Sequence, residues 1–280
     1  MSSRNRKRRP HWFTDAKWFF GIFFTVSLII VLVLFFFYKV TAEKPAIETM
    51  TKTIAITFSP LGLDDTTEIE ILKRKVLYSY NETARPINGL NLTIDKEDLE
   101  GKTPREIRLN FYKKIAELLY FDQAEELREM VENNEVRNNI EILESLSFLS
   151  QKTHRNISGL LLYFTFITFL FAIPFIFFSK RFGRLGNPGL VIFLVNFPGV
   201  ITFLVLSTLP QQEATPAIEN IQEMIGFILS SLLPPLAEDV TRYYILFLMV
   251  GFLMIFLAIV GKIVWKLFIP HHSNVISKDL

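Results

Sequence analysis

Four long apolar segments constrain the fold of this chain more than any other feature of its sequence. A bilayer core of about 30 Å requires about 20 residues of helix, because a helix satisfies its own backbone hydrogen bonds in lipid. The four segments cover residues 18–38, 159–178, 189–209 and 243–260, and none contains Asp, Glu, Lys, Arg or His. We therefore expect an α-helical integral membrane protein with four transmembrane helices.

The charges between these segments predict how the chain crosses the membrane. Residues 1–17, 179–188 and 261–280 together hold twelve Lys and Arg but only two acidic residues, whereas segments 39–157 and 210–242 hold 18 basic and 26 acidic residues. Short segments rich in Lys and Arg remain on the cytoplasmic side. We expect a multi-pass protein of the cell membrane with a basic cytoplasmic tail at each terminus, a cytoplasmic loop at 179–188, and the two acidic segments outside.

The first apolar segment also has an alternative interpretation as a signal peptide. Val40-Thr41-Ala42 resembles a signal-peptidase site that follows a basic tail and an apolar run. Secretory apolar regions are about 7–15 residues long, which is shorter than this run. We expect the segment to be retained as a membrane anchor.

Two Asn-x-Thr sequons lie within the segment predicted to be external. They start at Asn81 and Asn91, so both asparagines are possible glycosylation sites. Chance tripeptides in a chain that is never glycosylated are the alternative. A third sequon, at Asn156, lies too close to the second apolar segment to be a good acceptor.

Segment 39–157 has the mixed composition of a folded domain, and we predict an extracytoplasmic α+β domain inserted between transmembrane helices 1 and 2. Strands are expected at 51–58 and 90–94, where β-branched and apolar residues alternate, and a third at 71–80. Thr103-Pro104-Arg105-Glu106 predicts a capped helix that runs to about Tyr120. Further helices are expected at 122–133 and 136–151.

Segment 210–242 contains a predicted amphipathic helix that starts at Thr215-Pro216. The helix is expected to end at Pro234-Pro235, because proline cannot donate a backbone hydrogen bond. An interfacial helix on the outer leaflet, a re-entrant segment, and a cap beneath the external domain are the three alternatives.

Asn196, Pro198 and Gly199 lie near the middle of the third apolar segment. Pro198 removes a backbone donor and Gly199 permits bending, so these residues form a possible hinge or polar coordination point. The alternative is a static kink with an interhelical hydrogen bond from Asn196.

The sequence offers little catalytic chemistry. It has no cysteine and only four histidines, and it lacks phosphate-loop, nucleophile-elbow and His-Glu-x-x-His motifs. We therefore expect no catalytic, cofactor-binding or metal-binding residues and no enzymatic activity. The basic N-terminal tail precedes a membrane segment, so we expect it to contact anionic lipid and no nucleic acid.

Pumps and ion channels commonly carry ionisable side chains within the membrane, and this chain has none in its four apolar segments. We expect a non-enzymatic accessory, assembly or sensory subunit that acts through its external domain, with the lipid bilayer and other protein subunits as partners. In the order of spans and external segments, the chain resembles the four-span permeases of ABC systems. That resemblance implies a mechanotransmitting, permease-like subunit of a transport system as the alternative, although residues 179–188 are too few for the cytoplasmic coupling helix of that family. A membrane enzyme is the third hypothesis.

Overall fold

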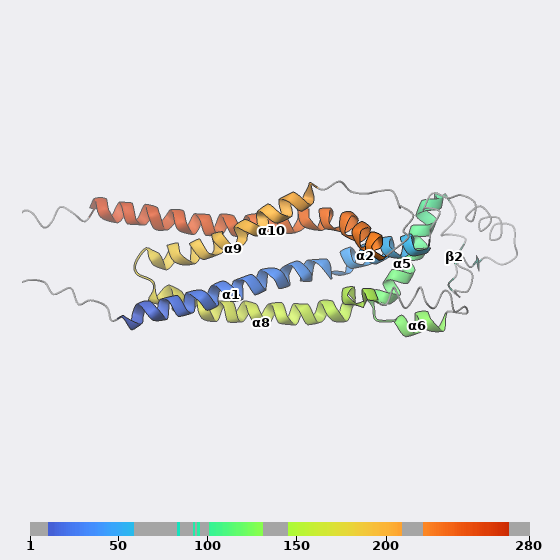
Figure 1. Ribbon diagram of the computed structural model, residues 1–280, viewed down its shortest axis with the longest axis horizontal. Helices are drawn as coiled ribbons and strands as arrows, with labels where there is room; N and C mark the ends of the chain where they lie inside the picture. The colour runs from blue at the N-terminus through green and yellow to red at the C-terminus, as the bar shows by residue number, and fades with distance from the viewer. Residues whose placement is uncertain are drawn as a thin grey trace, which may run out of the picture. The chain divides into compact units, whose positions relative to one another are not determined.

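The computed structural model describes residues 11–58, 83–84, 92, 94–95, 101–130, 145–208 and 221–268 (Figure 1). The chain divides into two compact units. Unit 1 comprises Met1–Phe35, Leu160–Val205 and Glu238–Leu280, and unit 2 comprises Phe36–Gly159 and Leu206–Ala237.

Four helices in the described part of the chain are long and apolar enough to cross a membrane, which confirms the prediction of four apolar helices. They are α1 (Trp12–Val40), α8 (Gln151–Phe178), α9 (Gly183–Ser207) and, within α10 (Ile221–Phe268), the segment Ala237–Leu267. Large apolar side chains cover the outside of unit 1; Leu162, for example, is 75% exposed and Phe166 is 67% exposed. A water-soluble protein rarely exposes so continuous an apolar surface, so a multi-pass membrane protein is the compatible class.

The helices of unit 1 extend beyond the apolar segments that predicted them. Helix α1 begins at Trp12 rather than residue 18, and α9 begins at Gly183 within the predicted loop 179–188. The prediction used apolarity alone, whereas a helix continues into its polar flanks because each added residue gains a backbone hydrogen bond. Only Ser179–Phe182 therefore connects α8 to α9.

Aromatic rings pack α1 against α8, and close backbone contact packs α9 against α10. The rings of Phe24 and Phe175 lie 5.8 Å apart, and those of Phe23 and Phe171 lie 5.1 Å apart. A Cβ atom added to Gly251 of α10 would lie 2.7 Å from the backbone nitrogen of Phe193 and 2.9 Å from the carbonyl oxygen of Gly189 in α9. Such contact requires glycine and is common between membrane helices.

The predicted helix end at Pro234-Pro235 is wrong, because α10 continues through both prolines. Each proline removes one backbone donor and its ring crowds the carbonyl of the preceding turn, but the hydrogen bonds of the turns before and after the pair remain available, so the helix can continue. The turn that follows carries an ion pair between Glu238 and Arg242, at 2.7 Å with i, i+4 spacing. From Ile221 onward, the predicted amphipathic helix and the fourth apolar segment are thus parts of one helix.

The described part of unit 2 is almost entirely helical, and the predicted strand at 51–58 is wrong. These residues belong to α2 (Glu43–Phe58). The only strands among the described residues are β1 (Thr83–Ala84) and β2 (Ile94–Asp95), which pair antiparallel over two residues each, so an α+β domain is not supported. The strand predicted at 90–94 overlaps β2 only at Ile94, and the one predicted at 71–80 lies outside the described residues.

Two features explain why α2 forms despite its β-branched residues. Ala46, Ile47, Met50 and Ile54 are buried at helical spacing, and this apolar face begins before the predicted strand. The hydroxyls of Thr49, Thr51 and Thr53 donate hydrogen bonds to the carbonyl oxygens four residues earlier, at 2.6, 2.7 and 3.0 Å. Packing of one helix face therefore overrides the local preference for a strand.

The predicted capped helix is confirmed as α5 (Pro104–Tyr120). The backbone N–H of Glu106 donates to Thr103 Oγ1 at 3.3 Å, and the backbone N–H of Thr103 donates to Glu106 Oε2 at 2.8 Å. This reciprocal capping box stabilises the first turn. The bond from the Thr103 backbone, with a second from the Thr103 hydroxyl, lowers the pKa of the Glu106 carboxyl.

The core of unit 2 lies between α2 and α5. Helix α5 contributes the buried side chains of Ile107, Phe111, Ile115 and Leu119, which face the apolar side of α2. The short helices α6 (Ala124–Glu129) and η1 (Ser145–Leu149) add Leu127, Leu146 and Leu149. The helix predicted at 122–133 is described only as α6, and the one predicted at 136–151 only as η1 and the first residue of α8; residues 131–133 and 136–144 lie outside the described part.

Candidate functional site

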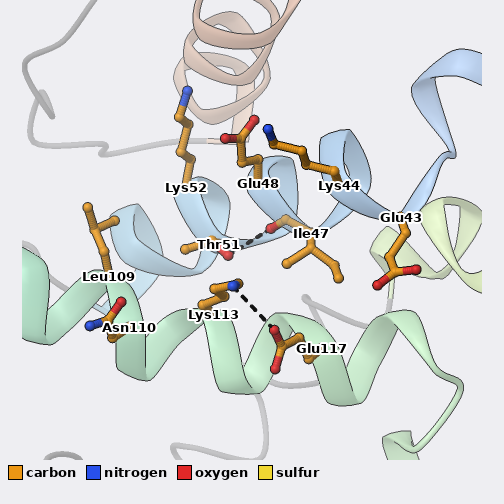
Figure 2. A pocket seen from close by; sticks show the side chains of 10 residues that line it. All are labelled: Glu43, Lys44, Ile47, Glu48, Thr51, Lys52, Leu109, Asn110, Lys113 and Glu117. Atoms are coloured by element: carbon orange, nitrogen blue, oxygen red, sulfur yellow. Dashed lines mark hydrogen bonds and ion pairs between the residues drawn. The ribbon is translucent and has the colours of Figure 1, made fainter. Parts of the chain in front are cut away.

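A groove between α2 and α5 is the candidate binding site of unit 2. It has a volume of about 600 Å³, which lies within the range of about 300–1,000 Å³ typical of ligand sites. Ten residues line it: Glu43, Lys44, Ile47, Glu48, Thr51 and Lys52 from α2, and Leu109, Asn110, Lys113 and Glu117 from α5 (Figure 2). The same two helices form the core, so the groove has a rigid base.

The groove carries balanced charge on both helices. Three lysines and three glutamates line it, and Figure 2 shows Lys44, Glu48 and Lys52 extending from the same side of α2. On α5, Lys113 Nζ lies 3.6 Å from Glu117 Oε1 in an exposed i, i+4 ion pair (Figure 2). Exposed pairs of this kind contribute little to stability, so their charges are available to an incoming partner.

Apolar and hydroxyl groups form the remainder of the groove wall. Ile47 is buried and Leu109 is half-buried, and the Thr51 hydroxyl donates to the Ile47 carbonyl oxygen at 2.7 Å (Figure 2). An apolar floor with a charged rim is suited to a polypeptide, whose side chains combine both kinds of surface.

A hydrogen bond from Tyr120, the last residue of α5, joins that helix to Thr41, the residue that follows α1. The Tyr120 hydroxyl donates to the carbonyl oxygen of Thr41 at 3.4 Å. Burial, together with the negative charge of Glu43, raises the pKa of the Tyr120 phenol, so the neutral hydroxyl persists as a donor. The Thr41 hydroxyl in turn lies 3.1 Å from His154 Nδ1, and the His154 ring stacks on Tyr38 with centroids 4.7 Å apart.

The predicted site residues fall in different parts of the chain. Asn81 and Asn91 lie outside the described residues, so glycosylation stays a prediction. Asn196, Pro198 and Gly199 all lie within α9, which is continuous from Gly183 to Ser207.

Asn196 is the buried member of this group, with 1% of its surface exposed. Its Nδ2 donates to the carbonyl oxygen of Ile192 in its own helix at 2.7 Å. Its Oδ1 is buried and has no hydrogen-bond partner among the described residues. The interhelical hydrogen bond considered from the sequence is therefore absent from the described contacts.

Gly199 allows close packing of α9 against α10. A Cβ atom at this position would lie 2.4 Å from Tyr244 Cε1. The Tyr244 hydroxyl donates to the carbonyl oxygen of Leu32 in α1 at 3.1 Å, so the ring is fixed between three helices. Pro198 is exposed. These contacts account for Gly199 without motion, and a hinge role stays a prediction.

The groove residues were not predicted from the sequence. Lys44, Glu48 and Lys52 repeat at intervals of four, and Lys113 and Glu117 have the same spacing. This pattern indicates one face of a helix. The spacing reveals a shared face only if residues 43–58 form a helix, whereas a strand was predicted at 51–58.

Comparison with known proteins identifies no relative. No family model, no curated protein and no solved structure matches the chain. Within the described ranges, no group of three His, Cys, Asp or Glu residues is placed to hold a metal ion. The geometry of the chain itself is thus the basis for any functional assignment.

Proposed function

We propose that this protein is a non-enzymatic membrane subunit that binds a partner protein in the α2–α5 groove, on the outer side of the cell membrane. The observation that carries the proposal is the groove itself, with a mixed-charge rim above an apolar floor on a packed two-helix core. The segregation of Lys and Arg into residues 1–17, 179–188 and 261–280 supports cytoplasmic termini and an external unit 2.

The partner is a polypeptide segment that carries both charges. Lys44, Lys52 and Lys113 would pair with its acidic side chains, while Glu43, Glu48 and Glu117 would pair with its basic ones. Complementary charges of this kind orient a partner and exclude others. An enzymatic role has less support, because the groove contains no histidine, cysteine or serine.

The permease-like alternative has less support than the subunit proposal. The connection between α8 and α9 is only Ser179–Phe182, which leaves no room for a separate cytoplasmic coupling helix. The accessory or assembly role needs no such helix, because its partner binds unit 2.

Reversing two groove charges tests the proposal. The full-length chain with Lys44→Glu and Lys52→Glu is expected to recover roughly tenfold less partner than the unmodified chain, because like charges then face each other, and tenfold corresponds to about 1.4 kcal/mol. Proteins that co-purify in mild detergent would be quantified by mass spectrometry.

The matched control reverses two charges elsewhere in unit 2. Glu125→Lys with Glu129→Lys changes exposed residues of α6, outside the groove. This variant is expected to recover the same partners as the unmodified chain. Equal recovery by the groove variant and the α6 variant would contradict the proposal.

A further inference from the structure

A second cavity lies inside unit 1, between α1, α8, α9 and α10. Its volume is about 440 Å³, and its wall is almost entirely apolar, with Phe24, Leu32, Ala172 and Ile192 among the lining residues. Only Thr165, Thr168 and Asn196 add polar side chains to this wall. Phe169, which is 65% exposed on the lipid-facing side, also lines the cavity, so a molecule dissolved in the bilayer could enter from the side.

Asn196 gives this cavity a defined chemical preference. Its Nδ2 donates to the Ile192 carbonyl oxygen at 2.7 Å. If the amide were flipped, Oδ1 would lie at that distance from the carbonyl oxygen and the two acceptors would repel each other, so the orientation of the Asn196 amide is fixed. The oxygen Oδ1 is therefore the unpartnered atom. A buried acceptor without a donor is costly and rare in native proteins, so it indicates a missing donor. The Thr168 hydroxyl does not supply one, since it donates to the Phe164 carbonyl oxygen at 2.8 Å.

We propose that the cavity binds a long-chain alcohol dissolved in the membrane, whose hydroxyl donates to Asn196 Oδ1 and whose hydrocarbon chain occupies the apolar wall. The occupant needs one donor and is otherwise apolar. A phospholipid does not fit, because its charged headgroup would have to leave the interface and enter a wall with no ionisable side chain. A quinone does not fit either, because it offers only acceptors to an atom that requires a donor.

A matched pair of competitors tests this chemistry on the intact protein. Full-length chain in mild detergent would be labelled with hexadecanol that carries a photoreactive diazirine in its chain, and the modified residues mapped by mass spectrometry. Labelling is expected at residues that line the cavity. Unlabelled hexadecanol is expected to compete roughly tenfold better than hexadecyl methyl ether, which has the same chain but no donor. Equal competition by the two compounds, or labelling spread over the lipid-facing surface, would overturn the proposal.

Two variants separate the hydrogen bond from the cavity. Asn196→Leu removes the acceptor and is expected to make the two competitors equal. Ala172→Phe leaves Asn196 in place but fills the cavity, and is expected to abolish cavity labelling. Asn187→Leu is the control, since Asn187 lies on the same helix outside this cavity and bonds to Ser179 Oγ at 2.9 Å. The comparison of competitors in unmodified protein stands even if a variant fails to fold. A preference for hexadecanol that persists in Asn196→Leu would contradict the assigned acceptor.

Discussion

Replacing Phe111 with alanine is expected to lower the free energy of unfolding of unit 2 by about 3–5 kcal/mol. Phe111 is 2% exposed and lies in the centre of the buried face of α5, where it packs in the core that α2 and α5 share. Truncation removes buried apolar surface and leaves a cavity that two helices cannot easily close. Amide hydrogen exchange of α2 and α5 in the full-length chain would measure the loss.

Phe148 provides the matched control for this change. It lies in η1 of the same unit but is 57% exposed, so Phe148→Ala removes the same atoms with little loss of packing. The free energy of opening that amide exchange reports for α2 and α5 is expected to change by no more than an ordinary surface substitution causes, about 0.5 kcal/mol. Similar effects of the two substitutions would show that α2 and α5 do not form the core described above.

Replacing Gly251 with alanine is expected to destabilise unit 1 by about 1–3 kcal/mol, the usual range for overpacking. The new Cβ atom would lie 2.7 Å from a backbone nitrogen and 2.9 Å from a backbone oxygen of α9, and a rotamer change cannot relieve contact with backbone. Helices α9 and α10 must therefore separate. Thermal unfolding of the full-length protein in mild detergent would measure the effect.

The control for this prediction is the same substitution at Gly159 in α8. A Cβ atom there has no neighbour within 4 Å, so Gly159→Ala adds helix propensity without a clash. Its unfolding temperature is expected to stay the same or to rise. A Gly251→Ala protein as stable as Gly159→Ala would contradict the close approach of α9 to α10.

The features that were predicted correctly from the sequence are those that depend on local chemistry. The four apolar segments were recognisable because a bilayer imposes one length and one composition on any helix that crosses it. The cap of α5 was recognisable because Thr103, Pro104 and Glu106 each have a defined role within a single turn.

The features that were missed depend on tertiary contacts. Thr51 and Thr53 favour a strand locally, and only the burial of Met50 and Ile54 against α5 makes their segment helical. The continuity of α10 through Pro234 depends on the backbone hydrogen bonds of the turns on either side of the prolines, whereas the sequence shows only the prolines themselves.

The candidate sites follow the same division. Asn196 was noticed because an amide is unusual in the middle of an apolar segment. Its unpartnered oxygen, however, depends on the carbonyl of Ile192 and on the cavity that residues of four helices line. The groove required the packing of α2 on α5, two segments about sixty residues apart in the chain, which no local pattern contains.

The side of the membrane on which the groove lies is the central claim, and cysteine labelling in intact cells tests it most directly. The chain has no cysteine, so Lys52→Cys in the groove and Lys180→Cys between α8 and α9 each provide a single reactive thiol at an exposed position. An impermeant thiol reagent is expected to label the cysteine at 52 in intact cells and the cysteine at 180 only after permeabilisation. Labelling at 180 in intact cells, with protection at 52, would contradict the proposed topology and with it the external binding site.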